Sequence, residues 1–410
     1  MKSWQSEVTT SLPRTAPAPA AAVLVTPGPD NRIAVYRLFL LGTGIVVLAK
    51  GAELVVFGNI DFNIDPWSFL GLFAGQVLYD SSRIAVRAAL IVGIAVTIAL
   101  LNAFPWLSIN APALGLAAGS GMTLLVRLFA VREQRREMSF ILALGLLMPL
   151  AHQICLFSQR MTTLHAETYD HRAFLVDASL GFSPAAAFAH ADLLGFMASG
   201  FVIVTVYTSL TFMMTVVILW KIRITDRSWM QALTAFVLAG VLGTALYHVF
   251  PVAGPRFAFA EGVPDPRTIS SAMAFLDQDV VRNGMPSLHT AWAFLIMMNA
   301  AGLPKWFRCF TVFYFAAMLL ATLATGQHYV IDLIVALPFA VAVQAVTLQL
   351  WHREGAYAPF WFGTLATAMW FFLLKDHVGL FLNTPGFTAT GMALTATATV
   401  LATRRLTCIP

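Results

Sequence analysis

Long apolar segments separated by short polar connections make up most of the chain from residue 34 onward. A helix that crosses a membrane needs about 20 mostly apolar residues. One further apolar segment, Pro66–Tyr79, has only about 14 residues, a length that also suits a re-entrant or interfacial helix. The candidate membrane helices are Ala34–Gly58, Ile84–Phe104, Pro112–Val131, Met138–Phe157, Leu193–Trp220, Met230–Phe250, Leu288–Gly302, Trp306–Thr325, Val330–Leu350, Pro359–Leu374 and Pro385–Ala402.

The composition agrees with a chain that lies mostly in a bilayer. Of its 410 residues, 59% are hydrophobic and 11% are charged, whereas a soluble domain carries about 25% charged residues. The three cysteines lie within or beside apolar segments and lack the spacing of metal ligands, so we expect neither a disulfide framework nor a metal or other cofactor. The chain is therefore predicted to be an all-α polytopic membrane protein with about 11–12 transmembrane helices.

The basic residues lie in the connections between apolar segments, which is the positive-inside pattern of membrane proteins. The net charge of +5 therefore does not indicate a nucleic-acid partner. We expect the chain to lie in the inner (plasma) membrane. If Pro66–Tyr79 also crosses this membrane, both termini lie in the cytoplasm. The outer, periplasmic side then receives the loops 158–192 and 251–287 and the turn around His328. The basic residues used for this topology are Arg32, Arg37, Arg132, Arg135, Arg136, Lys221, Arg223, Arg227, Lys305, Arg308, Arg353, Arg404 and Arg405.

The polar residues divide the chain into five predicted parts. Residues 1–32, rich in Pro and Ala, are expected to form a disordered cytoplasmic tail. The N-terminal helical region, 33–157, has no chemical motif, and its role is open between docking and lipid access. A periplasmic loop, 158–192, precedes a core at 193–352 that holds the motifs described next, and further transmembrane helices occupy 353–410. Within the loop, the segment Glu167–Asp177 mixes charges with apolar residues and is interpreted as a solvated connection, with an amphipathic lid as the alternative.

The first motif is Pro286-Ser287-Leu288-His289, directly before an apolar segment. Proline is favoured at the first position of a helix, where its missing N–H costs nothing. The free backbone N–H groups of Ser287, Leu288 and His289 would then form a phosphate-binding site at a positive helix terminus, with the His289 ring placed for proton transfer. The alternative is a proline-started helix with an interfacial histidine.

The second motif is His328-Tyr329-Val330-Ile331-Asp332, where His328 and Asp332 share one helix face. A carboxylate on one ring nitrogen would fix the tautomer and leave the other nitrogen as a nucleophile. An aspartate at a membrane helix is costly and needs a partner. A His–Asp pair that only locks the helix end is the alternative.

The third element is Arg256, which follows a helix end on the same predicted side as both histidines. Its guanidinium could bind a phosphate with two hydrogen bonds and stabilise charge in a transition state, or it could only contact lipid headgroups. Tyr247, His248 and Tyr329 flank these elements and are candidates for residues that support the site.

These motifs resemble the type 2 phosphatidic acid phosphatase superfamily. Pro-Ser-Leu-His and His-Tyr-Val-Ile-Asp look most like its inositol phosphorylceramide synthase branch, and the second motif also resembles sphingomyelin synthases. The resemblance covers about 190–352 and implies a six-helix core that acts on membrane lipids. It implies that His328 attacks phosphorus to form a phosphohistidine, that Asp332 orients it, and that His289 protonates the leaving group and then activates the acceptor. Arg256 and the region of Ser287 and Leu288 would hold the phosphoryl oxygens.

The chain departs from the usual superfamily pattern at three positions. Leu288 stands where glycine is usual, Thr322 stands where an arginine precedes the nucleophilic histidine, and Val249 occupies the place of the first-motif lysine. Fewer cations favour a singly charged phosphodiester over a doubly charged monoester. We therefore expect transfer of a phosphoryl-headgroup from a phospholipid to a lipid or alcohol acceptor. Hydrolysis of phosphatidic acid or of a polyprenyl phosphate or diphosphate is the alternative.

Two readings from other classes remain open. A haem protein could use His248, His289 and His328 as ligands, but two of these begin helices beside Pro-Ser and Asp. A transporter could bind an anionic lipid or solute at the same helix start, but the sequence shows no convincing internal repeat.

Overall fold

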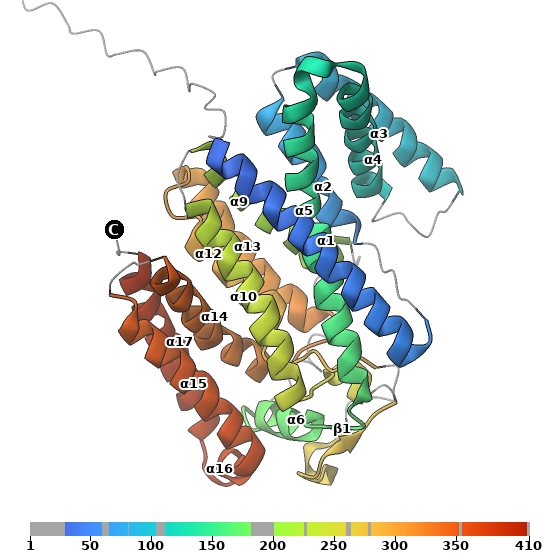
Figure 1. Ribbon diagram of the computed structural model, residues 1–410. Coiled ribbons are helices and arrows are strands. Elements are labelled where there is room, and N and C mark those ends of the chain that lie inside the picture. The colour runs from blue at the N-terminus through green and yellow to red at the C-terminus, as the bar shows by residue number, and fades with distance from the viewer. Residues whose placement is uncertain are drawn as a thin grey trace, which may run out of the picture.

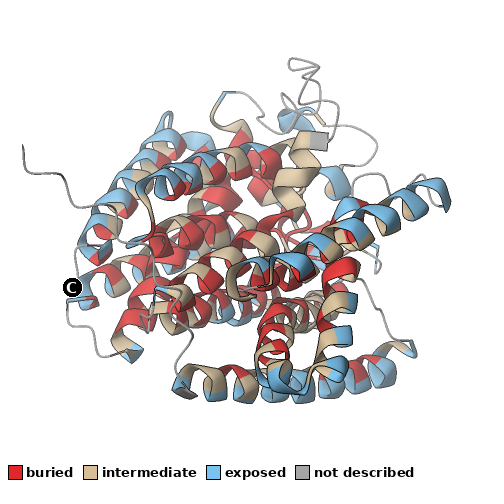
Figure 2. Ribbon diagram, turned by 90° about the horizontal axis from the view of Figure 1, so that it is seen from above, coloured by how far each residue is buried: buried red, intermediate tan, exposed pale blue. Residues whose placement is uncertain are grey.

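The computed structural model describes residues 29–59, 65–80, 82–103, 111–181, 201–224, 228–259, 264–277, 280–351 and 355–407. Figure 1 shows a cluster of helices with a small outer layer at one end, and Figure 2 shows buried residues gathered in the middle of the cluster. The expected tail falls mostly outside these residues, as do Arg227 and Arg353.

The helices before the site are α1 (Pro29–Phe57), α2 (Pro66–Tyr79), α3 (Arg83–Ala103), α4 (Ala111–Ala130) and α5 (Arg135–Met161). The outer layer consists of α6 (Asp170–Ala178) and an antiparallel pair of short strands, β1 (Glu167–Thr168) and β2 (Ala274–Phe275). The remaining helices are α8 (Phe201–Thr208), α9 (Leu210–Arg223), α10 (Ser228–Val249), α11 (Pro255–Ala258), α12 (Leu288–Asn299), α13 (Lys305–Ala324), α14 (Val330–Leu350), α15 (Tyr357–Asp376), α16 (Val378–Asn383) and α17 (Phe387–Thr407). Single 3-10 turns occur at Arg132–Gln134, Thr162–Leu164 and Pro266–Thr268.

The all-helical membrane fold is confirmed. Eight helices in the described part of the chain are long and apolar enough to cross a membrane, or nine if α8 and α9, bent by 50°, form one broken span. The expected number was higher because three of the apolar segments form helices that are too short or too polar to count as candidate spans. α2 has 14 residues and α12 has 12, while α17 is rich in threonine and ends in Arg404 and Arg405.

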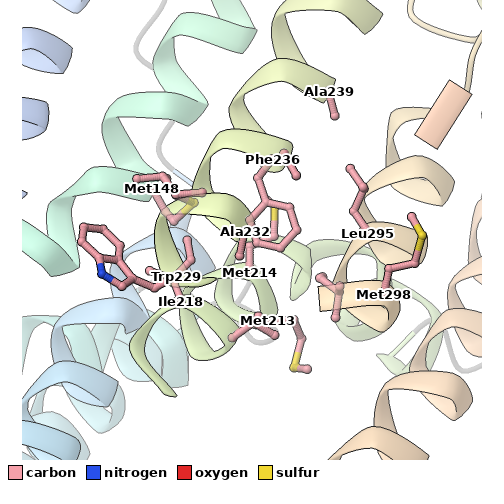
Figure 3. Close-up of a cluster of buried hydrophobic side chains, with 14 of the residues drawn as sticks. Met148, Met213, Met214, Ile218, Trp229, Ala232, Phe236, Ala239, Leu295 and Met298 are labelled. Carbon is pink, nitrogen blue, oxygen red and sulfur yellow. The ribbon is translucent and has the colours of Figure 1, made fainter. Parts of the chain in front are cut away.

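The largest buried cluster joins α5, α9, α10, α12 and α14, and it extends to Val35 and Leu72 near the N-terminus. Figure 3 shows its centre, where methionines of α5, α9 and α12 surround Phe236 of α10. Because one cluster includes residues from both sides of position 157, the N-terminal helices and the later helices are packed as one body.

Helix α2 is an internal helix. It packs against α4, α5 and α9, and Ser68 and Gln76 on it are fully buried. At its start Asp65 accepts hydrogen bonds from Trp67 N and from the Thr211 hydroxyl, at 3.1 and 2.7 Å. At its end Asp80 forms an ion pair with Arg127. Its length of about 21 Å is shorter than the hydrocarbon core of a bilayer, which suits a helix surrounded by protein.

The outer layer corrects the interpretation of Glu167–Asp177 as a solvated connection. The segment forms β1 and α6, and Asp170, Phe174 and Asp177 on α6 are buried. The apolar side chains of α6 pack with Tyr329 and with Trp370 of α15 in a second buried cluster. α6 therefore closes the end of the helix cluster at which α14 begins (Figure 1).

Candidate active site

Three connections meet at the end of the helix cluster that α6 closes. They are the segment after α10, the segment before α12 and the turn between α13 and α14. The backbone N–H of Arg256 donates to the Gly326 carbonyl at 2.8 Å, and that of Gly284 donates to the Val252 carbonyl at 2.6 Å. These bonds place all three predicted motifs at one point of the structure.

Two glycines allow this close approach. Gly254 has φ +99°, and a Cβ there would lie 2.1 Å from the Gln327 carbonyl oxygen. At Gly284 a Cβ would lie 2.7 Å from a side-chain carbon of Val252. Any larger residue at either position would separate the connections.

His328 is held by a backbone carbonyl. Its Nδ1 lies 3.0 Å from the Gly284 oxygen and 3.5 Å from Oδ2 of Asp332, and its side chain is almost fully buried. Because a carbonyl oxygen only accepts, Nδ1 carries the proton and Nε2 keeps its lone pair. The tautomer expected from the sequence is thus present, but the shorter bond comes from Gly284 and not from the carboxylate.

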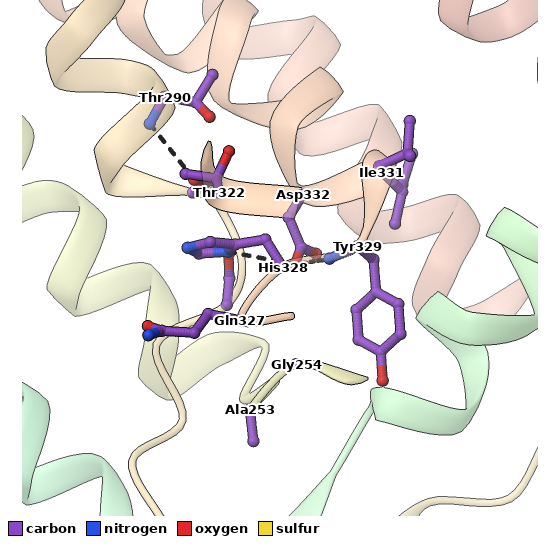
Figure 4. Close-up of polar contacts among 12 residues, drawn as sticks. Ala253, Gly254, Thr290, Thr322, Gln327, His328, Tyr329, Ile331 and Asp332 are labelled. Atoms are coloured by element: carbon purple, nitrogen blue, oxygen red, sulfur yellow. Dashed lines mark hydrogen bonds and ion pairs between the residues drawn. The ribbon is translucent and has the colours of Figure 1, made fainter. Parts of the chain in front are cut away.

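Asp332 lies beside His328, as the i, i+4 spacing requires, and it also caps α14 (Figure 4). Its Oδ2 accepts the backbone N–H of Tyr329 at 2.8 Å. Its other oxygen is buried and has no hydrogen-bond partner among the described residues. The carboxylate therefore locks the start of α14, as the alternative interpretation expected, and it also lies beside the His328 ring.

The start of α12 differs from the prediction in two ways. The helix begins at Leu288 with Ser287 as its N-cap, so Pro286 lies before the cap and not at the first helical position. The hydroxyl of Ser287 accepts the Thr290 N–H, while the Ser287 N–H donates to the Asp332 carbonyl at 3.2 Å.

The expectation of three free N–H groups at this helix start is therefore wrong for Ser287, because its N–H has a partner within the protein. The side chain of Leu288 points into the core, where it fills the space over Gly243 of α10. A leucine in place of the usual glycine thus adds packing at this position.

The His289 ring faces His328, with 6.2 Å between the ring centroids. On its other side it stacks on Tyr207, with centroids 3.7 Å apart and planes 19° apart. The Tyr207 hydroxyl donates to Gln327 Oε1 at 2.8 Å. Tyr207 reaches this position because the chain bends at Ser209, between α8 and α9.

Tyr207 belongs to no motif and was not among the predicted site residues. Its only signal is a tyrosine within an otherwise apolar helix, a residue type that also occurs at interfaces.

Arg256 has an exposed side chain beside the turn that leads to His328, without a hydrogen-bond or ion-pair partner among the described residues. Tyr247 is buried in the same hydrophobic cluster as Leu288. Tyr329 points away from the imidazole of His328 and donates to Asp170 at 3.1 Å (Figure 4). His248 contacts His165, with 3.0 Å between their ring nitrogens.

Two buried aspartates of α6 hold the site from outside. Oδ1 of Asp170 accepts the Gly254 N–H at 2.8 Å, and its Oδ2 accepts the Ala253 N–H at 3.0 Å. Asp177 accepts the N–H groups of Val330 and Ile331 at 2.7 and 3.1 Å, which caps α14 directly after His328. Burial raises the pKa of both carboxyls, that of Asp177 to about 8.

The burial of these aspartates was not predicted, because charged residues in a loop are usually solvated. Their signal is the run Ala173–Val176 between them, since apolar residues flanked by acids seven positions apart suit a buried helix face.

Among the described residues, no three His, Cys, Asp or Glu side chains come together as metal ligands would.

Residues 172–346 match the family model described as the PAP2 superfamily. The chain carries a PAP2 superfamily domain. The domain begins within α6 and ends within α14, so it contains both histidine motifs, Arg256 and Asp177. It implies a membrane enzyme, a phosphatase or phosphotransferase, that acts on phosphate esters. No curated protein and no solved structure matches the chain.

Proposed function

We propose that this PAP2 domain transfers a phosphoryl-headgroup from a membrane phospholipid to a lipid or alcohol acceptor, through a phosphohistidine on His328. The observation that carries the proposal is the hydrogen bond between His328 Nδ1 and the Gly284 carbonyl. It leaves Nε2 as a lone-pair nucleophile on a buried side chain, and the ring centroid of His289 lies 6.2 Å from that of His328.

In the first step, Nε2 of His328 forms a bond to phosphorus and the P–O bond to the diacylglycerol oxygen breaks. His289 donates a proton to that oxygen as the lipid alcohol leaves. Asp332, 3.5 Å from Nδ1, stabilises the positive charge that the His328 ring acquires. In this proposal Arg256, whose backbone is bonded to Gly326 in the turn before His328, supplies the cation that contacts the phosphoryl oxygens.

In the second step, the acceptor alcohol transfers its proton to His289 and attacks phosphorus. The N–P bond breaks and His328 returns to its starting tautomer. Tyr207 keeps the His289 ring in a fixed plane during both proton transfers.

A phosphodiester donor and an alcohol acceptor are favoured by the composition of the site. Thr322, at the position where the superfamily usually has arginine, is buried and donates to carbonyls of its own helix. One cation fewer suits a diester, which carries about one negative charge. The burial of His328 and Asp332 limits water, which favours an alcohol as acceptor. Basic residues at the helix ends opposite the site, such as Lys221 and Arg223 of α9, favour an outward-facing active site by the positive-inside rule.

The test is a panel of phospholipid donors and alcohol acceptors, read by mass spectrometry with the purified protein. We expect transfer with the wild type, none with His328→Ala, and a loss of about 10²–10⁴-fold with His289→Ala. His377→Ala, an exposed histidine beside α16, is the matched control and should retain activity. If the protein releases inorganic phosphate from phosphatidic acid and forms no transfer product, its activity is that of a phosphatase and not of a transferase. Equal results for the wild type and both site variants would refute the catalytic reading.

A further inference from the structure

At the end of the helix cluster opposite the site there is a cavity of about 410 Å³. The two are separated by α10, which starts shortly after Arg223 and ends beside the site, a length of about 33 Å for its 22 residues. The cavity is lined by Val77, Leu78, Asp80, Arg83, Val86, Arg87 and Arg223. Its volume lies within the range of about 300–1,000 Å³ that is usual for small-molecule sites.

Three arginines from two helices line this cavity. Arg83 and Arg87 lie one turn apart on α3, and Arg223 lies in the last turn of α9. Within the part of the chain that the structure describes, the side chains of these three arginines form neither a hydrogen bond nor an ion pair.

The acidic residue of the lining does not neutralise them. Oδ1 of Asp80 accepts the Ser82 N–H at 2.8 Å, and its Oδ2 pairs with Arg127 of α4. The cavity therefore keeps a surplus of positive charge. Its other wall, formed by Val77, Leu78 and Val86, is apolar.

We infer that this cavity binds the phosphate-bearing headgroup of an anionic membrane lipid. The arginine forks match phosphate oxygens, and the apolar wall suits the glycerol and the first carbons of the acyl chains. The arginines lie at the ends of membrane-crossing or membrane-embedded helices, where basic pockets meet anionic headgroups. Such a lipid would join α3 to α2 and α9, whose direct contacts with α3 are few compared with those of α4.

The experiment uses the full chain, purified in mild detergent and analysed by native mass spectrometry with added phosphatidylglycerol, cardiolipin or phosphatidylcholine. The variant R83Q/R87Q/R223Q removes the cavity arginines. The control R132Q/R135Q/R136Q removes the same number of exposed arginines near the C-terminal end of α4, outside the cavity. We expect the cavity variant to bind anionic lipid at least about tenfold more weakly than the control, with equal binding of phosphatidylcholine.

Equal loss in both variants would mean general surface charge and would overturn the inference, as would unchanged binding in the cavity variant. Inorganic phosphate and glycerol 3-phosphate form a second arm. Failure of both to displace the lipid supports a lipid ligand, whereas binding of either as tight as that of the lipid assigns the cavity to a soluble phosphate. If the triple variant does not fold, the single variant Arg87→Gln is compared with Arg135→Gln in the same lipid-binding measurement. Both side chains are exposed.

Discussion

His328 Nδ1 lies 3.0 Å from the carbonyl oxygen of Gly284, a residue 44 positions earlier in the chain. This bond links the two histidine motifs directly, since Gly284 leads into the helix that carries His289. It also fixes which nitrogen of His328 is free. The geometry of the candidate nucleophile therefore depends on a connection whose side chains take no part in it.

Substituting Gly254 by alanine should lower activity at least about tenfold, because the new Cβ would lie 2.1 Å from the carbonyl of Gln327 beside His328. Gly302→Ala is the control: its φ of +84° is equally left-handed, but nothing lies within 4 Å of its Cβ. Steady-state transfer rates and thermal unfolding of both variants separate the effects. A similar loss of activity in the two would point to backbone strain alone.

Leu288 and Gly243 should show coupled effects on stability. Leu288→Ala leaves a cavity over Gly243 and is expected to cost about 2–5 kcal/mol, while Gly243→Ala would place a Cβ 2.4 Å from Leu288. In the double variant the added methyl fills part of the vacated space, so its destabilisation should be smaller than the sum. Thermal unfolding in detergent measures the cycle. Strict additivity would show that the two side chains do not share this space.

Tyr207 should affect proton transfer without contacting the phosphate. Tyr207→Ala removes the ring stacked on His289 and is expected to lower the rate and shift the pH profile of kcat/KM. Tyr207→Phe keeps the ring and loses only the hydrogen bond to Gln327, so it should remain close to the wild type. A profile for the alanine variant that is scaled but not shifted would reduce Tyr207 to a packing residue.

Asp177 should make stability depend on pH. Burial raises its pKa from an ordinary value of 3.8 to about 8, so the folded state holds a proton that the unfolded state releases. The contribution of Asp177 to stability is full below pH 3.8 and is lost as the pH rises to about 8. The unfolding temperature in detergent should therefore fall over this range, and Asp177→Asn should reduce the slope. Asp265→Asn, at an exposed 3-10 turn, should not, and equal slopes in all three proteins would contradict the assignment.

The helical membrane fold and the meeting of three motifs could be predicted because apolar length and helix-start residues are local signals. The spacing of His328 and Asp332 likewise fixed their common face. The helix start at Ser287 shows the limit of such signals. Whether its N–H is free depends on the Asp332 carbonyl, 45 positions later, and every residue carries a carbonyl. The burial of Asp177 could not be predicted because charged residues in loops are usually solvated.

Helix α6 has a consequence for how this protein can be divided. A fragment that starts at residue 193, where the hydropathy pattern suggests a cut, would encode His289, His328 and Arg256. It would omit the two carboxyl groups of α6 that bind the backbone of the Gly254 connection and of the first turn of α14. Such a fragment would contain every motif residue yet lack an assembled centre. If these catalytic residues are grafted onto another membrane protein, α6 has to be included with the two histidines.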